Sequence, residues 1–268
     1  MWKKSSIFIV LGFIMTLTAC KSSFDTLLVS TNNEEKLKSA YTYYGEGEFY
    51  KAQLLFEQIM PFYRGTPEID SIYYNYANTH YNLDNYVLSS YYFKNYTTTF
   101  ANGVFSEDAL YMTAFASYKM SPSYKLDQTY TQQAIDGFQL FANRYPTSEK
   151  VTICNALIDE LRVKLERKAV ASADLYYKLG NFQSADYAYR NLLKEYPDSK
   201  DTEKIRYRIV LASYKLAENT IEIKQVQRYV AVLKNCTDFT KRHMDSEYSK
   251  EVIDIREACK SKLTKLAQ

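Results

Sequence analysis

The stretch 169–197 constrains the fold of this chain more than any other. Its apolar residues recur at helical spacing in two runs, 169–179 and 183–196. Between the runs Gly180 predicts a tight turn, because glycine adopts positive φ angles without a Cβ clash. Ala185 and other small residues stand where two helices would touch. The sequence therefore predicts a hairpin of two helices, and one such hairpin cannot bury its apolar face without neighbours.

The rest of the chain supplies those neighbours. A small residue followed four positions later by an aromatic ring is typical of the second helix of a tetratricopeptide repeat. This spacing occurs at Ala52/Phe56, Ser89/Phe93, Ala134/Phe138 and Ala185/Tyr189. Glycine (7) and proline (5) are scarce, which also favours helix over strand. We predict an all-α fold, a right-handed solenoid of about five such hairpins.

Three further segments shape the predicted solenoid. No glycine or proline interrupts 149–179, so we expect one long helix, or two nearly collinear ones, joining the N-terminal repeats to the C-terminal ones. The turn at 121–131 is enlarged, either as a docking loop or as a tolerated insertion. The amphipathic segment 248–266 predicts a helix that caps the last repeat and is also able to dock a partner. Thr31 and Glu34 have capping-box spacing for the first repeat helix.

The N-terminus has the layout of a secretory signal. Lys3 and Lys4 precede a short apolar run, and the segment ends in Leu17-Thr18-Ala19-Cys20. This ending resembles the lipobox of bacterial lipoproteins. The resemblance implies a signal peptide at 1–19, lipid on Cys20, and a tether over 20–32; the alternative is an ordinary signal peptide with an incidental cysteine. Several acyl chains give stable anchoring, since each buried methylene contributes about 0.8 kcal/mol.

We find no catalytic, metal or nucleic-acid signature in the sequence. The two histidines, His80 and His243, belong to no recognised motif, and the net charge of +3 is spread over mixed signs. We expect no enzyme activity, no cofactor and no metal. Cys236 and Cys259 are the best-placed pair for a disulfide, but each cysteine after Cys20 also fits as a small apolar residue of a helix, and their odd number favours this second interpretation.

The first helices of stacked repeats line a concave face. Counting from the small residue of each first helix predicts ten residues on that face, in a chain with 27 tyrosines. Tyrosine rings suit an extended or amphipathic peptide, because they offer apolar area and a hydroxyl for backbone groups. The ten residues of this predicted groove are Leu37, Tyr41, Tyr44, Tyr74, Asn78, Tyr81, Asp108, Tyr111, Phe115 and Tyr118.

One further set of positions carries a resemblance to a known family: Tyr145-Pro146, Ser148, Leu161, Leu165, Glu166, Ala173, Tyr176-Tyr177, Gly180, Ala185, Arg190 and Tyr196-Pro197-Asp198. Over about residues 20–240, the chain resembles the BamD family of outer-membrane β-barrel assembly lipoproteins. The resemblance implies a scaffold on the periplasmic face of the outer membrane. Its N-terminal repeats (33–147) would receive segments of nascent barrel proteins. Its long helix and C-terminal repeats (148–268) would bind a BamA-like insertase, with other assembly-complex lipoproteins as further partners.

Three alternatives remain open from the sequence. A repeat lipoprotein of the cell-wall or division machinery would share the fold and the anchor. A glycan-binding or nutrient-binding lipoprotein would use the tyrosine rings for stacking on sugars. An envelope hydrolase would need two carboxylates that converge in a cleft.

Overall fold

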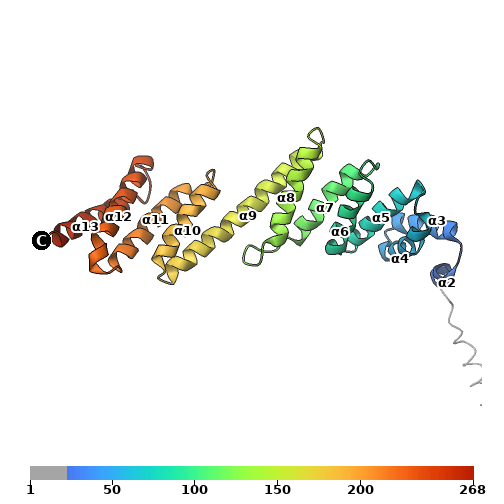
Figure 1. Ribbon diagram of the computed structural model, residues 1–268, viewed down its shortest axis with the longest axis horizontal. Helices are drawn as coiled ribbons and strands as arrows, with labels where there is room; N and C mark the ends of the chain where they lie inside the picture. The colour runs from blue at the N-terminus through green and yellow to red at the C-terminus, as the bar shows by residue number, and fades with distance from the viewer. Residues whose placement is uncertain (1–22) are drawn as a thin grey trace, which may run out of the picture. The chain divides into compact units, whose positions relative to one another are not determined.

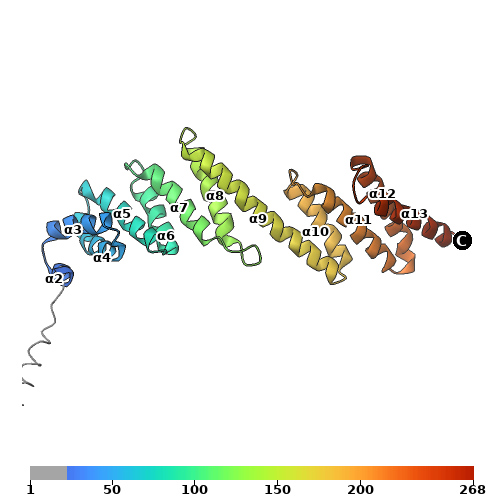
Figure 2. The same cartoon turned by 180° about the vertical axis from the view of Figure 1, so that it is seen from behind.

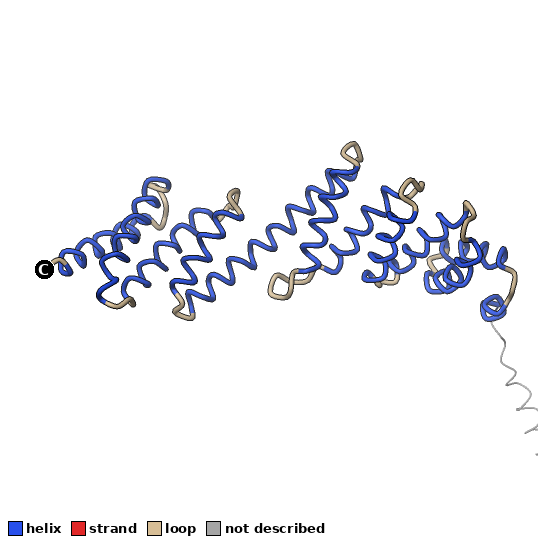
Figure 3. Tube along the Cα trace, viewed as in Figure 1, coloured by secondary structure: helices blue, strands red, loops and turns tan. Residues whose placement is uncertain are grey.

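The computed structural model describes residues 23–268, so the predicted signal peptide and Cys20 lie outside the described residues. Every regular element between residues 23 and 268 is a helix, and this part of the chain contains no strand (Figure 3). Contacts divide the chain into two compact units: unit 1 extends to Ser121 and resumes at Thr129–Ile158, and unit 2 comprises Pro122–Gln128 and Asp159–Gln268. The all-α prediction is therefore confirmed for the described residues.

Unit 1 is a series of helical hairpins (Figure 1). Each helix from α3 to α8 packs against the next one along the chain, as a solenoid of repeats requires. The elements are α2 (Ser23–Val29), α3 (Asn33–Gly45), α4 (Phe49–Ile59), the 3-10 helix η2 (Met60–Tyr63), α5 (Glu68–Asn82), α6 (Tyr86–Thr99), α7 (Ser106–Met120) and α8 (Thr129–Arg144).

Unit 2 continues the same succession (Figure 2). Helix α9 (Lys150–Lys178) is a single long helix, which confirms the expected uninterrupted helix and supplies residues to both units. It is followed by α10 (Phe182–Glu195), α11 (Thr202–Glu218), α12 (Glu222–Arg242) and α13 (Ser249–Leu266). Helices α10 to α13 each pack against the next, and the expected terminal helix is present as α13.

The repeat signature positions form the cores of the hairpins. Ala52 and Phe56 are fully buried with Ala40 between α3, α4 and α5. Ala185 and Ala173 are likewise fully buried where α10 meets α9. The turn between those two helices contains Gly180 at φ 76°, a left-handed conformation that costs glycine little. The predicted tetratricopeptide-like hairpins are therefore confirmed, and the small residues lie where two helix backbones approach.

The predicted tether contains a helix that packs against the first hairpin. Phe24, Leu27 and Leu28 of α2 contact the core between α3 and α4. The buried ammonium group of Lys36 fixes this contact, because Nζ donates to the Leu28 carbonyl at 2.9 Å and to Gln58 Oε1 at 2.7 Å. The sequence pattern of the segment gave no sign of this contact, since it depends on residues up to Gln58.

The N-cap of α3 differs from the prediction. Asn32, and not Thr31, occupies the cap position, and its Oδ1 accepts a hydrogen bond from the Glu35 amide at 3.1 Å. The expected capping box at Thr31 is therefore wrong by one residue. Asparagine satisfies the free amide of the first turn as well as threonine does, so the helix starts one position later.

The enlarged turn between α7 and α8 is an ordered loop over 121–128. The buried amide of Gln128 donates to the Ser123 and Leu126 carbonyls, both at 2.9 Å. The guanidinium of Arg167 on α9 lies 4.3 Å from the ring centre of Tyr124. These contacts account for the loop's order and leave its docking role a prediction.

The cysteines behave as small apolar residues. Cys154, Cys236 and Cys259 are all free and fully buried. Cys236 and Cys259 belong to the core shared by α11, α12 and α13, beside Val210 and Val252. Burial raises the pKa of Cys236 to about 11 and that of Cys259 to about 12, so both thiols stay protonated.

Candidate functional site

The predicted groove residues lie on the first helices of the three hairpins of unit 1. Leu37, Tyr41 and Tyr44 are on α3, the next three on α5 and the last four on α7. None of the ten is buried: Tyr41 is exposed and the other nine are half-buried. A repeat core would bury such rings completely, so these side chains form a surface.

We call these ten positions the tyrosine face, and contacts between helices join its α5 and α7 parts. The Tyr74 hydroxyl of α5 donates to the Asp108 carboxylate of α7. Tyr74 also stacks on Phe105, with ring centres 4.3 Å apart. Lys150, at the start of α9, pairs with the other oxygen of Asp108 and lies 5.0 Å from the ring centre of Tyr111. A charged pair thus lies among aromatic rings.

An aromatic ladder continues the tyrosine face along α7. Phe115 stacks on Tyr111 with ring centres 5.5 Å apart and on Tyr118 at 5.7 Å, each pair within 16° of parallel. Tyr81 of α5 reaches the same Phe115, with ring centres 6.1 Å apart. Rings spaced in this way offer a row of partly exposed apolar surfaces with hydroxyl groups at their edges.

The α3 end of the face is more open. Tyr41 contacts Phe56 edge-on at 5.3 Å between ring centres, and Tyr44 contacts Phe49 in the same manner at 5.5 Å. Leu37 packs against the core between α3 and α4. Tyr41, 36% exposed, is the most accessible tyrosine of the ten residues.

The hydroxyls of this face remain neutral donors. Burial raises the pKa of Tyr44, Tyr74 and Tyr111 above the usual tyrosine value, and the nearby Asp108 carboxylate raises all three further. At neutral pH these groups therefore stay uncharged; Tyr74 already donates its proton to Asp108, so its oxygen is left to accept a hydrogen bond. The face can bind the backbone or the polar side chains of a ligand without any ionisation of its tyrosines.

Sequence reasoning missed Lys150 and Phe105 as members of the face. Both lie outside the stripe of the first helices, Phe105 just before α7 and Lys150 in the first turn of α9. Periodicity within one helix cannot identify them, because their contacts come from the packing of separate helices.

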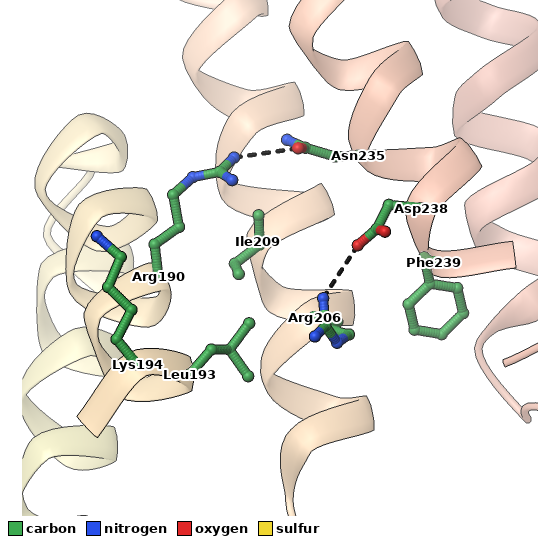
Figure 4. A pocket seen from close by; sticks show the side chains of 8 residues that line it. All are labelled: Arg190, Leu193, Lys194, Arg206, Ile209, Asn235, Asp238 and Phe239. Carbon is green, nitrogen blue, oxygen red and sulfur yellow. Dashed lines mark hydrogen bonds and ion pairs between the residues drawn. The ribbon is translucent and has the colours of Figure 1, made fainter. Parts of the chain in front are cut away.

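A second candidate site is a cationic pocket in unit 2, with a volume of about 290 Å³ (Figure 4). Leu193, Ile209 and Phe239 supply its apolar surface, and charged or polar side chains from α10, α11 and α12 surround them. The polar residues are Arg190, Lys194, Arg206, Asn235 and Asp238.

The arginines of this pocket are held in place by neighbours. Arg190 bonds Asn235 Oδ1 at 3.1 Å, as Figure 4 shows, and Arg206 pairs with Asp238 at 3.0 Å. Arg190 also pairs with Asp186 at 2.8 Å. Lys194 is exposed and forms no ion pair with any residue from 23 to 268. Arg190 and Arg206 are thus already paired with carboxylates, and Lys194 is the lining cation whose charge is left for a further partner.

Comparison with known families assigns the chain. Residues 30–203 match the profile of the YfiO family, described as an outer membrane lipoprotein. The chain belongs to this family. The YfiO match covers the whole tyrosine face and ends within α11, so part of the cationic pocket lies beyond it.

Other comparisons add little to the YfiO assignment. No curated protein sequence matches the chain. Among solved structures, the TPR2AB domain of yeast Sti1, in its complex with pHSP90, aligns with a TM-score of 0.42 and 11% identity, over 85% of this chain and 98% of that one.

The described residues contain neither a candidate membrane-spanning helix nor a candidate metal cluster. Among residues 23–268, no helix combines the length and apolarity that crossing a bilayer requires. The same part of the chain has no group of three or more histidine, cysteine, aspartate or glutamate side chains placed to hold a metal ion.

Proposed function

We propose that this protein is a non-enzymatic adaptor lipoprotein of the machinery that inserts β-barrel proteins into the outer membrane. The tyrosine face captures an extended segment of a nascent barrel protein. The cationic pocket of unit 2 docks the BamA-like insertase. The lipid on Cys20 holds the protein on the periplasmic face of the membrane. The YfiO match supports an outer membrane lipoprotein, and the barrel-assembly role comes from the sequence resemblance to the BamD family.

The tyrosine face carries the capture step. Six of its ten residues are tyrosines, and their neutral hydroxyls suit the backbone groups of an extended peptide. An outer-membrane strand alternates apolar and polar side chains. The aromatic ladder at Phe115 would take its apolar side chains, and the Asp108–Lys150 pair would take polar ones.

The cationic pocket carries the docking step. A carboxylate that reaches Lys194 and Arg190 would gain charge-assisted hydrogen bonds above an apolar floor. Arg190 and Arg206 are already oriented by Asn235 and Asp238, so binding would cost little side-chain entropy.

The capture step is tested by peptide binding to the purified protein. Tyr41→Ala combined with Asp108→Asn should weaken the binding of a peptide from the last strand of an outer-membrane barrel about tenfold, or about 1.4 kcal/mol. Tyr50→Ala is the matched control, because Tyr50 is 63% exposed on α4, outside the face. Equal affinity in all three proteins would show that the tyrosine face does not bind the peptide.

The docking of the insertase is tested by a pull-down in mild detergent, with mass spectrometry of the proteins that co-purify. We expect a barrel protein with periplasmic domains, in near-equal amount, and a reduced yield with Lys194→Glu. Lys224→Glu is the control, since Lys224 is exposed at the other end of α12 from Asp238. Recovery of cell-wall or division enzymes instead would replace the barrel-assembly role by the alternative adaptor role.

A further inference from the structure

Unit 2 has an open depression of about 840 Å³ at the turn between α9 and α10. It is separate from both sites described above and shares no residue with either. Its lining comes from the end of α9, the turn, one side of α10 and the end of α11. The residues used below are Tyr176, Asn181, Gln183, Ser184, Tyr187 and Asn191.

No lining residue of this depression carries a charge. The chain is 24% charged, yet the surface here consists of amides, a hydroxyl, aromatic rings and small or apolar groups. The cationic pocket, formed partly by the same helix α10, has three cations. Helix α10 therefore presents a charged side to one site and an uncharged side to the other.

Four polar side chains of the depression are available to a ligand, whereas the amide of a fifth, Asn219, donates to the Lys215 carbonyl at 2.8 Å. Among residues 23–268, the side chains of Asn181, Gln183, Ser184 and Asn191 form no hydrogen bond with another protein group. Ser184, Tyr187 and Asn191 lie three and four positions apart, so they share one stripe of α10, opposite the buried Ala185 and Tyr189. Each amide offers both donors and an acceptor.

Two tyrosine rings line the same depression as these amides. Tyr187 is 68% exposed and Tyr176 is 43% exposed, so neither ring contributes its full area to the core. An exposed aromatic face is a platform for the C–H side of a sugar ring, whose hydrogens carry partial positive charge towards the negative face of the π system.

We propose that this depression binds a neutral glycan, with Tyr176 and Tyr187 as stacking platforms and the amides of Asn181, Gln183 and Asn191 as partners for hydroxyl or N-acetyl groups. Sugar hydroxyls donate and accept at once, and amide side chains match them in both respects. The volume lies within the usual range of small-molecule sites, about 300–1,000 Å³.

The absence of charge from the lining decides between ligand classes. A phosphate, an acidic lipid headgroup or a carboxylate would need a cation, and none lines the depression. For a segment of a barrel protein, the proposed function already assigns another site, the tyrosine face on the first helices of unit 1. A neutral ligand rich in hydroxyl groups remains as the class that the exposed rings and unpaired amides match.

The test is titration calorimetry of the full-length protein, in a detergent without a sugar headgroup. The probes are two tetrasaccharides, one of N-acetylglucosamine and one of glucose, which separate an N-acetylated from a plain glycan. We expect one of them to bind, and Tyr187→Ala to weaken that binding roughly tenfold, about 1.4 kcal/mol. Tyr50→Ala, with a similar exposure of 63%, should leave it unchanged.

Two results would overturn the proposal. One is the absence of heat with both tetrasaccharides; the other is equal sugar affinity in the Tyr187→Ala and Tyr50→Ala proteins. A barrel-strand peptide is titrated in parallel. Loss of peptide binding in Tyr187→Ala, without any sugar binding, would identify the depression as a protein site. The tyrosine-face variants test the capture step separately, so either proposal can fail alone.

Discussion

Replacing Gly137 by alanine should destabilise the protein, although helix propensity alone predicts that alanine stabilises a helix relative to glycine. Gly137 lies on α8 where that helix packs against α7. A Cβ at residue 137 would lie 2.8 Å from the Cβ of Ala114 and 3.2 Å from its Cα. Ala114 is 1% exposed, and its Cβ and Cα belong to the helix itself, so they cannot rotate away as a long side chain would.

The expected size follows from two opposing terms. Alanine gains about 0.8–1.0 kcal/mol over glycine within a helix. Forcing an extra methyl group into a packed contact costs typically about 1–3 kcal/mol, because the helices must separate. The clash is larger than the gain at a 2.8 Å contact, so Gly137→Ala should lower the free energy of unfolding by about 1 kcal/mol.

Urea unfolding followed by far-ultraviolet circular dichroism measures this change. Gly45→Ala is the matched control, because Gly45 is the last residue of α3 and a Cβ there would meet no atom within 4 Å. It should stabilise the protein through propensity alone. The double variant Ala114→Gly/Gly137→Ala, which removes the opposing Cβ, should recover part of the loss. A Gly137→Ala protein as stable as Gly45→Ala would refute the steric argument.

Two shorter predictions concern acidity and anchoring. His80 is buried against Tyr76 and Tyr92, and burial lowers its pKa, whereas in the unfolded chain it titrates at about 6.5. The unfolded state therefore takes up the proton first, and the free energy of unfolding should fall as the pH drops below about 6.5. Urea unfolding at several pH values measures this pH dependence, and His80→Gln should make it less steep. An equally steep dependence in the variant would show that other groups cause it. Cys20→Ala should move the protein from the membrane fraction to the soluble fraction; full membrane retention would contradict the lipobox interpretation.

Local rules predicted the hairpins well. The period of apolar residues, the glycine at 180 and the prolines after the second helices depend on interactions within a few residues, and these are set by the sequence itself. The same holds for α9, since nothing between Lys150 and Lys178 interrupts a helix. The N-cap, predicted at Thr31 but formed by Asn32, shows where this reasoning is weakest, because both of these adjacent residues suit the position.

For the candidate sites too, the sequence predicted the residues that share one helix and missed those that other helices contribute. The stripe of first-helix positions predicted residues of α3, α5 and α7 that the structure leaves partly exposed, because helical geometry places them on one side of each helix; their peptide binding stays a prediction. Their partners Phe105 and Lys150 came only from the structure, since they reach the face from other segments. The cationic pocket likewise combines α10, α11 and α12, and no spacing within one helix indicates it.

By itself the sequence determined the helical repeats and their turns, because each depends on neighbours along the chain. Only the tertiary structure decided that Lys36 ties α2 to the first hairpin, that Asp108 joins Tyr74 to Lys150, and that one side of α10 is charged and the other neutral. These contacts join residues 8 to 42 positions apart, as the Lys36–Leu28 and Lys150–Asp108 contacts illustrate. Their existence depends on how helices pack, which the period of a single helix does not encode.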